Sequence, residues 1–472
     1  MSLEFNLISS DKYCTYITDG THGTHINQES GKYLLSAKDI LDGVVHIKEN
    51  SRVISEEDFN KIHKNYKLEN YDVLLTVAGT IGRTAIIRNY KNNYTFQRSV
   101  AIFKTNDKLK SLWLYYYLNS PIGKQIVKSL SKGTTQLILP LKDLRNLEIP
   151  VPKNIEDQKK ILSILVNIDK KIEVNKKINK NLEKTLITIF NSWFINFENY
   201  DNSKGMKIDD SYGEIPVDWS VEMLEDYVDF VTGVEPGSKN YHEKPEPNDI
   251  PFLRVGDLGS RDNGVFIDPS LSKNKILKYD DIVLSLDATI GIVKMGLEGA
   301  YSTGMRKLVI KNDNINQPFL YCLVKSNRIQ RIIETFATGT TMLHAGKSIK
   351  HMNFVLSDKK TMDDFGKIGN PIISIILTNL KEIEYLTNLR DTLLPKLMSG
   401  EIDVSKINCD LKIIIRKIYI KSSKLFLWRY LSENQNHIKN TKSNETLLKS
   451  RTIYKINKFL AKFNARYRYY RQ

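Results

Sequence analysis

Residues 155–194 read IEDQKKILSILVNIDKKIEVNKKINKNLEKTLITIFNSWF, and the spacing within this stretch decides the fold. Apolar side chains recur in alternating steps of four and three residues, which predicts one long helix with a single apolar stripe. Such a stripe must be covered by a second helix, from this chain or from another. The stripe contains Ile161, Leu165, Ile168, Ile172, Leu182, Leu186 and Ile189.

A second stretch, residues 373–397, has the same spacing and can supply the cover. The segments NLEKTL at 181–186 and NLRDTL at 388–393 align at an offset of 207, which indicates a duplicated unit. Either stripe alone would suit an ordinary core helix, but two related stripes favour a pair of long spacer helices. Asn175 and Asn179 interrupt the first stripe and are expected to fix the register of the pair. The second stripe contains Ile376, Leu380, Ile383 and Leu393.

The repeat extends beyond the helices. Segments 71–82 and 280–291 share Thr-Ile-Gly at an offset of 209, and Gly-Thr-Thr occurs both at 133–135 and at 339–341. Each copy alternates short β-like runs with turn signals, and residues 252–255 are one such predicted strand. The predicted fold class is therefore α+β, with two similar mixed α/β domains and two long helices.

The expected organisation follows from these patterns and from a polar segment rich in Asp, Asn, Ser and Gly after the first long helix. It comprises a first domain over residues 1–152, a central spacer helix over 153–199, a linker over 200–212, a second domain over 213–358, a C-terminal spacer helix over 361–404 and a basic extension over 405–472.

The net charge of +16 is unevenly distributed. Residues 408–472 hold 16 Lys and Arg against 3 acidic residues, which leaves 54 basic and 51 acidic residues in the rest of the chain. Any nucleic-acid surface on the body must therefore be a local patch. The sequence has no signal peptide pattern and no long apolar run, so we expect a cytoplasmic protein without a membrane segment.

Motifs for catalysis are missing from the sequence. Gly346-Lys347-Ser348 lacks the preceding glycine of a phosphate-binding loop, and Pro371 is better explained as the first residue of a helix than as part of an aminomethylase motif. His22 and His25 have no third metal ligand nearby, so contact with solvent or a partner is the simpler interpretation. We therefore expect no catalytic residue and no metal site.

The order of the motifs resembles that of the specificity subunit of type I restriction-modification enzymes. The resemblance covers residues 1 to about 405, and each motif is weak alone. The residues that carry it are Asp19-Gly20-Thr21-His22, Thr80-Ile81-Gly82 and Thr289-Ile290-Gly291, Gly133-Thr134-Thr135 and Gly339-Thr340-Thr341, Ser192-Trp193-Phe194, residues 213–219 and residues 393–400.

The resemblance implies two target-recognition domains that each read half of a bipartite sequence in double-stranded DNA. Two long helices, packed antiparallel as a coiled coil with a pseudo-twofold relation, would hold the domains apart. Two methyltransferase subunits would dock on the chain, and restriction motor subunits would bind through them. The resemblance places no cofactor in this chain, because S-adenosylmethionine, ATP and Mg would belong to the partner subunits.

Base reading requires polar side chains on loops that can enter a groove, with cations on the phosphates. Each candidate could instead be a solvated surface residue. A non-enzymatic bridging protein with two binding modules is the alternative, and DNA reading differs from it in requiring such loops on one common side of both domains. The candidates are His22, Lys38, Arg83, Arg98, Lys132, Gln136, Arg254, Lys294, Arg306 and Lys347.

Two features depart from the family pattern. The first domain lacks a counterpart of Pro216-Val217-Asp218-Trp219, which suggests a shortened N-terminus. The family pattern also ends soon after Ile402, whereas this chain continues. The mixed aromatic and basic residues at 454–471 could bind backbone phosphates or stack on bases, but an extension without selected function is the plainer interpretation.

Overall fold

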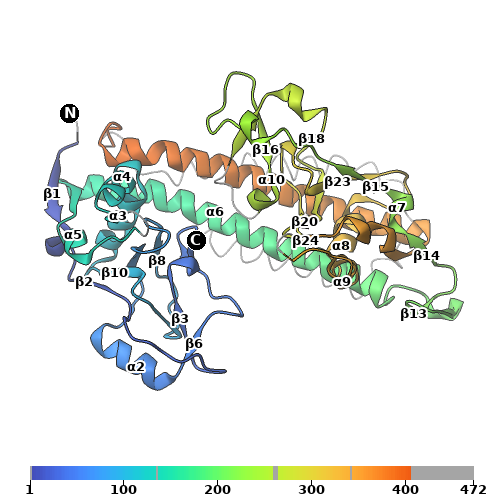
Figure 1. Ribbon diagram of the computed structural model, residues 1–472, viewed down its shortest axis with the longest axis horizontal. Helices are drawn as coiled ribbons and strands as arrows, with labels where there is room; N and C mark the ends of the chain where they lie inside the picture. The colour runs from blue at the N-terminus through green and yellow to red at the C-terminus, as the bar shows by residue number, and fades with distance from the viewer. Residues whose placement is uncertain (1–2, 134–136, 259–263, 341–342, 405–472) are drawn as a thin grey trace, which may run out of the picture.

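The computed structural model describes residues 3–133, 137–258, 264–340 and 343–404. Two globules are joined to a pair of long helices, α6 (Ile155–Phe190) and α10 (Lys359–Met398). Figure 1 shows the helices side by side, with one globule toward each end of the pair. The expected basic extension and Gln136 lie outside the described residues.

The two long helices run antiparallel. Contacts between them join Asp169 to Arg390, 221 residues apart, but Asn179 to Ile376, only 197 apart, so the separation shrinks as α6 advances. Ile168, Ile172 and Ile383 are buried between them. The seam is completed by the partly buried residues Ile164, Leu380, Leu386, Leu389 and Leu393.

Each end of the helix pair is also part of a globular core. The first core takes Ile161 and Leu165 from α6 and Leu397 from α10. The second takes Leu186 and Ile189 from α6, together with residues of the first half of α10. Because each helix is shared between two cores and a common seam, the globules are held at a fixed separation.

The start of α10 differs from the prediction, because Pro371 lies inside the helix and is not its first residue. The helix begins at Lys359, where the side chain of Asp358 accepts a hydrogen bond of 2.9 Å from the Thr361 backbone N–H. A proline inside a helix costs about 3 kcal/mol. Burial of Phe365 before it and Ile373 after it offsets this cost, since both side chains enter the second core.

The main sheet of the first globule is antiparallel in the order β2-β10-β7-β8. A smaller sheet in the order β6-β3-β9 adjoins it, and β1 pairs with β11 where the chain enters α6. The elements are β1 (Phe5–Ser9), β2 (Tyr16–Asp19), β3 (Lys32–Leu35), β6 (Val53–Ile54), α2 (Glu56–Asn65), β7 (Val73–Thr76), β8 (Thr84–Ile86), β9 (Tyr94–Phe96), β10 (Val100–Lys104), α3 (Lys108–Asn119), α4 (Pro121–Ser129) and β11 (Glu148–Pro152).

The second globule repeats this arrangement. Its main sheet has the order β15-β23-β19-β21, a smaller sheet has the order β17-β16-β22-β18, and β14 pairs with β25 before α10 begins. The elements are β14 (Ser220–Met223), β15 (Val228–Thr232), β16 (Ile250–Leu253), β17 (Val265–Ile267), β18 (Ile276–Leu277), β19 (Ile282–Ser285), β21 (Val293–Lys294), β22 (Gly299–Tyr301), β23 (Met305–Ile310), α8 (Gln317–Lys325), α9 (Asn327–Thr335) and β25 (Asn353–Leu356).

The Thr-Ile-Gly blocks predicted to repeat adopt the same turn. The backbone N–H of Gly82 donates to the Thr76 carbonyl at 3.0 Å, and that of Gly291 donates to the Ser285 carbonyl at 2.8 Å. Both glycines have positive φ, at 89° and 81°, which explains why glycine occupies this place in each copy. The internal repeat is confirmed at the level of individual hydrogen bonds.

Two segments differ in detail from the sequence expectation. The expected linker 200–212 contains β12 (Met206–Asp209), which pairs with β13 (Gly213–Pro216), because the Asp209 carboxylate accepts backbone hydrogen bonds that close the turn. The strand expected over 252–255 ends at Leu253, since the Asp257 carboxylate accepts the Arg254 backbone N–H at 2.9 Å and starts a 3-10 turn. In both places a local side-chain hydrogen bond decides the backbone path.

No helix within the described ranges is both long and apolar enough to span a bilayer.

Candidate nucleic-acid interface

One edge of each main sheet gathers several loops, and in the first domain these loops carry four of the predicted contacts, His22, Arg83, Arg98 and Lys132. In the first domain, β2 and β7 end at the edge where their antiparallel neighbours β10 and β8 begin. A further loop joins this edge through a bridge between Ala78 and Ile138. We call this the first recognition edge, formed by residues 20–25, 77–83, 97–99 and 132–138 without the undescribed 134–136. The corresponding residues 233–238, 286–292, 302–304 and 338–344, without 341–342, form the second recognition edge.

The loop after β2 and the turn before β10 meet at the first edge. The Arg98 backbone N–H donates to the Thr21 carbonyl at 3.0 Å, and both Arg98 and His22 are exposed. Their close approach depends on Gly20, because a Cβ there would lie 2.1 Å from the Phe96 carbonyl oxygen. The ring Nε2 of His22 lies 2.9 Å from a carboxylate oxygen of the aspartate that ends β2. The turn therefore holds a histidine and an arginine side by side.

Lys38 lies next to this pair. It is exposed on the short helical turn Ala37–Asp39, and the Ala37 backbone N–H donates to the Ser99 hydroxyl at 3.1 Å. Asp39 closes the turn by accepting the Ser36 backbone N–H at 2.8 Å. The structure thus brings His22, Lys38 and Arg98 together from three separate loops.

Two further candidates lie at the same edge but are more constrained. Arg83 is half-buried before β8, and its backbone N–H donates to the Thr76 hydroxyl at 2.9 Å. The Lys132 ammonium lies 2.6 Å from the Asp143 carboxylate, with the lysine side chain 68% exposed. An exposed ion pair of this kind is weak, so Lys132 can exchange Asp143 for a phosphate at little cost.

The candidate arginines of the second domain are held by neighbouring protein groups. Arg254 donates to both carboxylate oxygens of Asp257, at 3.0 and 3.2 Å, and these hydrogen bonds raise the pKa of Arg254. Arg306 is only 14% exposed and donates to the carbonyl oxygens of Met305, at 3.0 Å, and Thr303. Burial lowers the pKa of Arg306. Both guanidinium groups thus stabilise local structure.

The two candidate lysines of the second domain lie in different places. Lys347 is exposed on the turn Gly346–His351, directly after the loop of the second recognition edge. Lys294 instead lies near Glu183 of the helix α6. Burial raises the pKa of Glu183, but hydrogen bonds from Lys325 and Tyr321 lower it below its usual value, and the charge of Lys294 lowers it further. Lys294 is therefore not gathered with the other candidates.

Sequence reasoning missed the residues that orient the second edge. His344, in β24 (Leu343–His344), lies with Nδ1 2.7 Å from Oδ1 of Asp287. The other carboxylate oxygen of Asp287 is 4.0 Å from Arg306. Asp287 and His344 are 57 residues apart, so only the match between the two repeats could have drawn attention to them.

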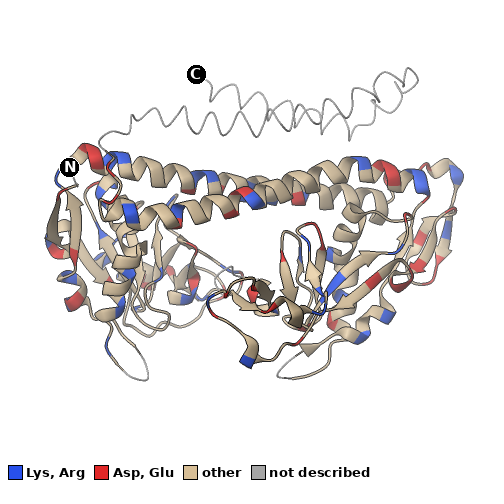
Figure 2. Ribbon diagram, turned by 90° about the horizontal axis from the view of Figure 1, so that it is seen from above, with Lys and Arg blue, Asp and Glu red and all other residues tan. Residues whose placement is uncertain are grey.

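The two globules lie on the same side of the helix pair, as Figure 2 shows. His22 and His25 each turn toward a different aspartate, since His25 Nδ1 lies 3.3 Å from Asp58. The two histidines are thus separately engaged and do not converge on a common ligand.

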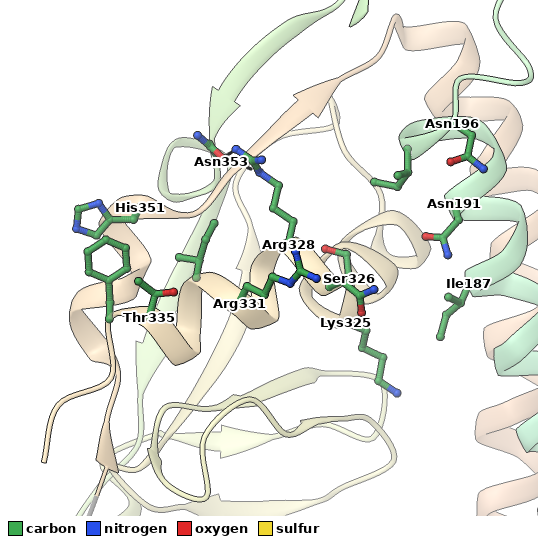
Figure 3. Close-up of a pocket in the computed structure, with 14 residues that line it drawn as sticks. Ile187, Asn191, Asn196, Lys325, Ser326, Arg328, Arg331, Thr335, His351 and Asn353 are labelled. Atoms are coloured by element: carbon green, nitrogen blue, oxygen red, sulfur yellow. Dashed lines mark hydrogen bonds between the residues drawn. The ribbon is translucent and has the colours of Figure 1, made fainter. Parts of the chain in front are cut away.

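A cavity of about 740 Å³ lies elsewhere, between the end of α6, α9 and the start of β25. Figure 3 shows Arg328 reaching Asn353, to whose side-chain oxygen it donates at 2.9 Å, while Lys325 points away. The rings of His351 and Phe336 stack with centroids 3.7 Å apart. None of the nine predicted DNA contacts that lie within the described residues lines this cavity, so it is separate from the recognition edges.

The chain contains two copies of one module, with unlike loops at matching edges and a shared pair of long helices. Comparison with known proteins agrees: the family model described as type I restriction modification DNA specificity domain matches residues 24–184 and 216–392. The chain belongs to the type I restriction-modification specificity subunits. It is therefore a DNA-binding component of a complex with partner subunits.

The chain is similar to several individual proteins. The MjaIX specificity subunit of Methanocaldococcus jannaschii is 30% identical over 351 residues, which cover 71% of this chain and 78% of the relative. The HindI specificity subunit of Haemophilus influenzae is 24% identical over 390 residues, covering 68% and 84%. The crystal structure of an S subunit from M. genitalium aligns with 84% of this chain and 96% of its own, with a TM-score of 0.46 and 19% identity.

Proposed function

We propose that this chain reads a bipartite target in double-stranded DNA, one half with each domain. The observation that carries the proposal is that two globules with matching sheet edges lie on one side of a helix pair that is rooted in both cores. A rigid separation between two reading surfaces corresponds to a fixed number of unspecified base pairs between two half-sites. The chain itself performs no chemical step in this proposal.

The unlike side chains of the two edges support the reading of two unlike half-sites. Arg98 and His22 are exposed in the first edge with Lys38 on the adjoining turn, whereas His344 is exposed in the second edge with Lys347 directly after it, and Arg306 beside that edge donates to backbone carbonyls. Cations of the first kind neutralise phosphates, and polar groups on loops read base edges. In this proposal the first recognition edge contacts one half-site and the second recognition edge contacts the other.

The proposed complex contains two methyltransferase subunits, because the pseudo-twofold scaffold presents the same backbone surfaces twice. These subunits would methylate adenines in the target, and restriction motor subunits bound through them would cleave DNA. S-adenosylmethionine, ATP and Mg would be bound by those partners. We place the complex in the cytoplasm, where chromosomal and incoming DNA are both accessible.

The test is to co-express the chain with the methyltransferase of its proposed complex and sequence modified adenines across the host genome. We expect a single split motif with two short specified halves and a constant gap. Exchange of residues 24–136 for those of a relative should change only one half of the modified motif. The unchanged half then serves as the internal control. A soluble complex that modifies nothing would favour the alternative, a bridging protein with two binding modules.

The basic extension is tested in the same system. Deletion of residues 405–472 should leave the modified motif unchanged if the extension has no part in recognition. An altered motif, or uniformly weaker modification, would assign those residues to base reading or to phosphate binding respectively.

A further inference from the structure

One backbone position in the two recognition edges carries chemically opposite side chains. In the first domain a loop is closed by paired backbone hydrogen bonds between Lys132 and Ile138, both at 2.8 Å. In the second domain the same pairing joins Thr338 and His344, at 3.0 and 2.8 Å. The next residue then donates its N–H to the strand end of the main sheet in both copies, at 2.9 and 2.7 Å. Ile138 and His344 are therefore structurally equivalent.

The residues beside Ile138 and His344 also differ between the two domains. Ile138 forms a bridge with Ala78, and His344 pairs with Asp287 at the same place. The strand register places a third residue beside them, because Thr76 faces Val100 as Ser285 faces Met305, which makes Ala101 equivalent to Arg306. The first domain thus has Ala78, Ala101 and Ile138 where the second has Asp287, Arg306 and His344.

The polar set is built to orient His344. A carboxylate can only accept, so the Nδ1 atom of His344, 2.7 Å from Asp287, carries a proton and donates it. Asp287 is itself only 22% exposed and lies beside the 14% exposed Arg306. The histidine side chain is 58% exposed. The ring is thus held through Nδ1 by Asp287, whose other carboxylate oxygen faces Arg306, and its Nε2 atom is left for a partner outside the domain.

The apolar set exposes hydrocarbon at the same place. Ile138 is 50% exposed, and the adjacent Leu137 is 47% exposed. Leu343, the equivalent of Leu137, is also exposed, at 38%. Large apolar side chains on an edge otherwise lined by polar residues are unfavourable in water and are suited to an apolar partner group. In a DNA groove the apolar group on a base edge is the thymine methyl.

We propose that this shared position reads one base pair in each half-site, through the thymine methyl with Ile138 and through a hydrogen bond to a base edge with His344 oriented by Asp287. This inference rests on the proposed function and names the residues through which the two domains would prefer different half-sites. Asp287 is a positioning residue, since it acts through the imidazole and makes no base contact itself.

The experiment compares His344→Ala, Ile138→Ala and the control His351→Ala in the full complex, with the preference at every target position measured by sequencing of modified adenines. We expect His344→Ala to reduce discrimination about 10- to 100-fold at one position of one half-site. Ile138→Ala should reduce the preference for thymine at one position of the other half. His351→Ala should change neither, because His351 stacks on Phe336 outside the recognition edges.

Two further variants separate reading from folding. His344→Asn keeps a donor toward Asp287 but removes the outward nitrogen, so it should lose discrimination as His344→Ala does. His344→Gln keeps an outward polar group and should retain part of it. Uniform weakening at all sequences would identify a phosphate contact and overturn the inference, as would unchanged preferences. An unsubstituted complex that modifies no split motif would instead overturn the proposed function on which the inference rests.

Discussion

Asn175 donates a hydrogen bond of 2.7 Å to Glu382, and these residues occupy the same position in the two copies of the repeat, 207 residues apart. Equivalent residues of antiparallel helices meet only where a pseudo-twofold axis passes between them, so this contact marks the centre of the molecule. Lys171 also contacts Glu382, at 3.1 Å, and Asn179 donates to the Ile376 carbonyl at 3.0 Å. A polar layer therefore interrupts the apolar seam at its midpoint.

Asn175→Ala should lower the free energy of unfolding by about 1 kcal/mol, although alanine is the better helix former. The loss arises because Asn175 is 1% exposed, and its removal leaves a void and takes one of two donors away from the Glu382 carboxylate, which keeps its contact with Lys171. Chemical denaturation measures the effect. The control Lys177→Ala removes an exposed ion pair with Glu173 and should cost about 0.5 kcal/mol or less. An Asn175→Ala chain as stable as the parent would contradict a stabilising role for the layer.

Gly20→Ala and Gly233→Ala should each destabilise the protein by about 1–3 kcal/mol. A Cβ at either position would lie 2.1 Å from a carbonyl oxygen, of Phe96 or of Tyr301, so the loop must move away from the sheet. Thermal denaturation reports the loss. Gly256→Ala is the matched control, because its Cβ would meet no described atom within 4 Å and its stability should change by about 0.5 kcal/mol at most. Equal stability of all three variants would show that the close approach is not required.

Lys38→Ala and Arg98→Ala should weaken DNA binding about equally at all sequences and reduce the slope of log affinity against log salt by about 1 each. Both side chains are exposed at the first recognition edge, where they can neutralise phosphates. Titration of a labelled duplex at several salt concentrations gives the slope. Arg254→Ala is the control, because its charge is already paired with Asp257, and its slope should remain that of the parent. A change in base preference would instead assign base contacts to Lys38 or Arg98.

Acidification should destabilise the first domain through His63. Burial, together with the charges of Lys67 and Lys104, lowers the pKa of His63 from 6.5 to about 4. Between pH 6.5 and pH 4 the unfolded chain therefore binds a proton at His63 that the folded chain does not bind. The stability that depends on neutral His63 is present above pH 6.5 and is lost as the pH falls toward 4. His63→Gln, which cannot be protonated, should show a smaller decrease in urea midpoint between pH 7 and pH 4.5. Identical decreases would exclude His63 as the source.

Much of the architecture could be predicted because it depends on the periodic spacing of residues along the chain. A heptad stripe and a repeat offset are properties of the chain read in order, and both survive in the structure as α6, α10 and two matching globules. The position of Pro371 could not be predicted in this way. The local cap at Asp358 starts the helix earlier, and the burial of Phe365 in the second core is a tertiary effect; together they outweigh the preference of proline for a helix start.

The candidate site shows the same division. His22, Lys38 and Arg98 could be proposed from their places in or beside repeated motifs, and loop packing brings them together. That Arg306 is largely buried follows only from the packing of its strand in the sheet, and that Asp287 orients His344 follows only from two strands that are 57 residues apart in sequence. The sequence by itself determined the helices, the duplication and the family resemblance, because these depend on spacing along the chain. The tertiary structure alone decided which charges are exposed and which are already paired, because pairing and desolvation depend on neighbours that are distant in sequence.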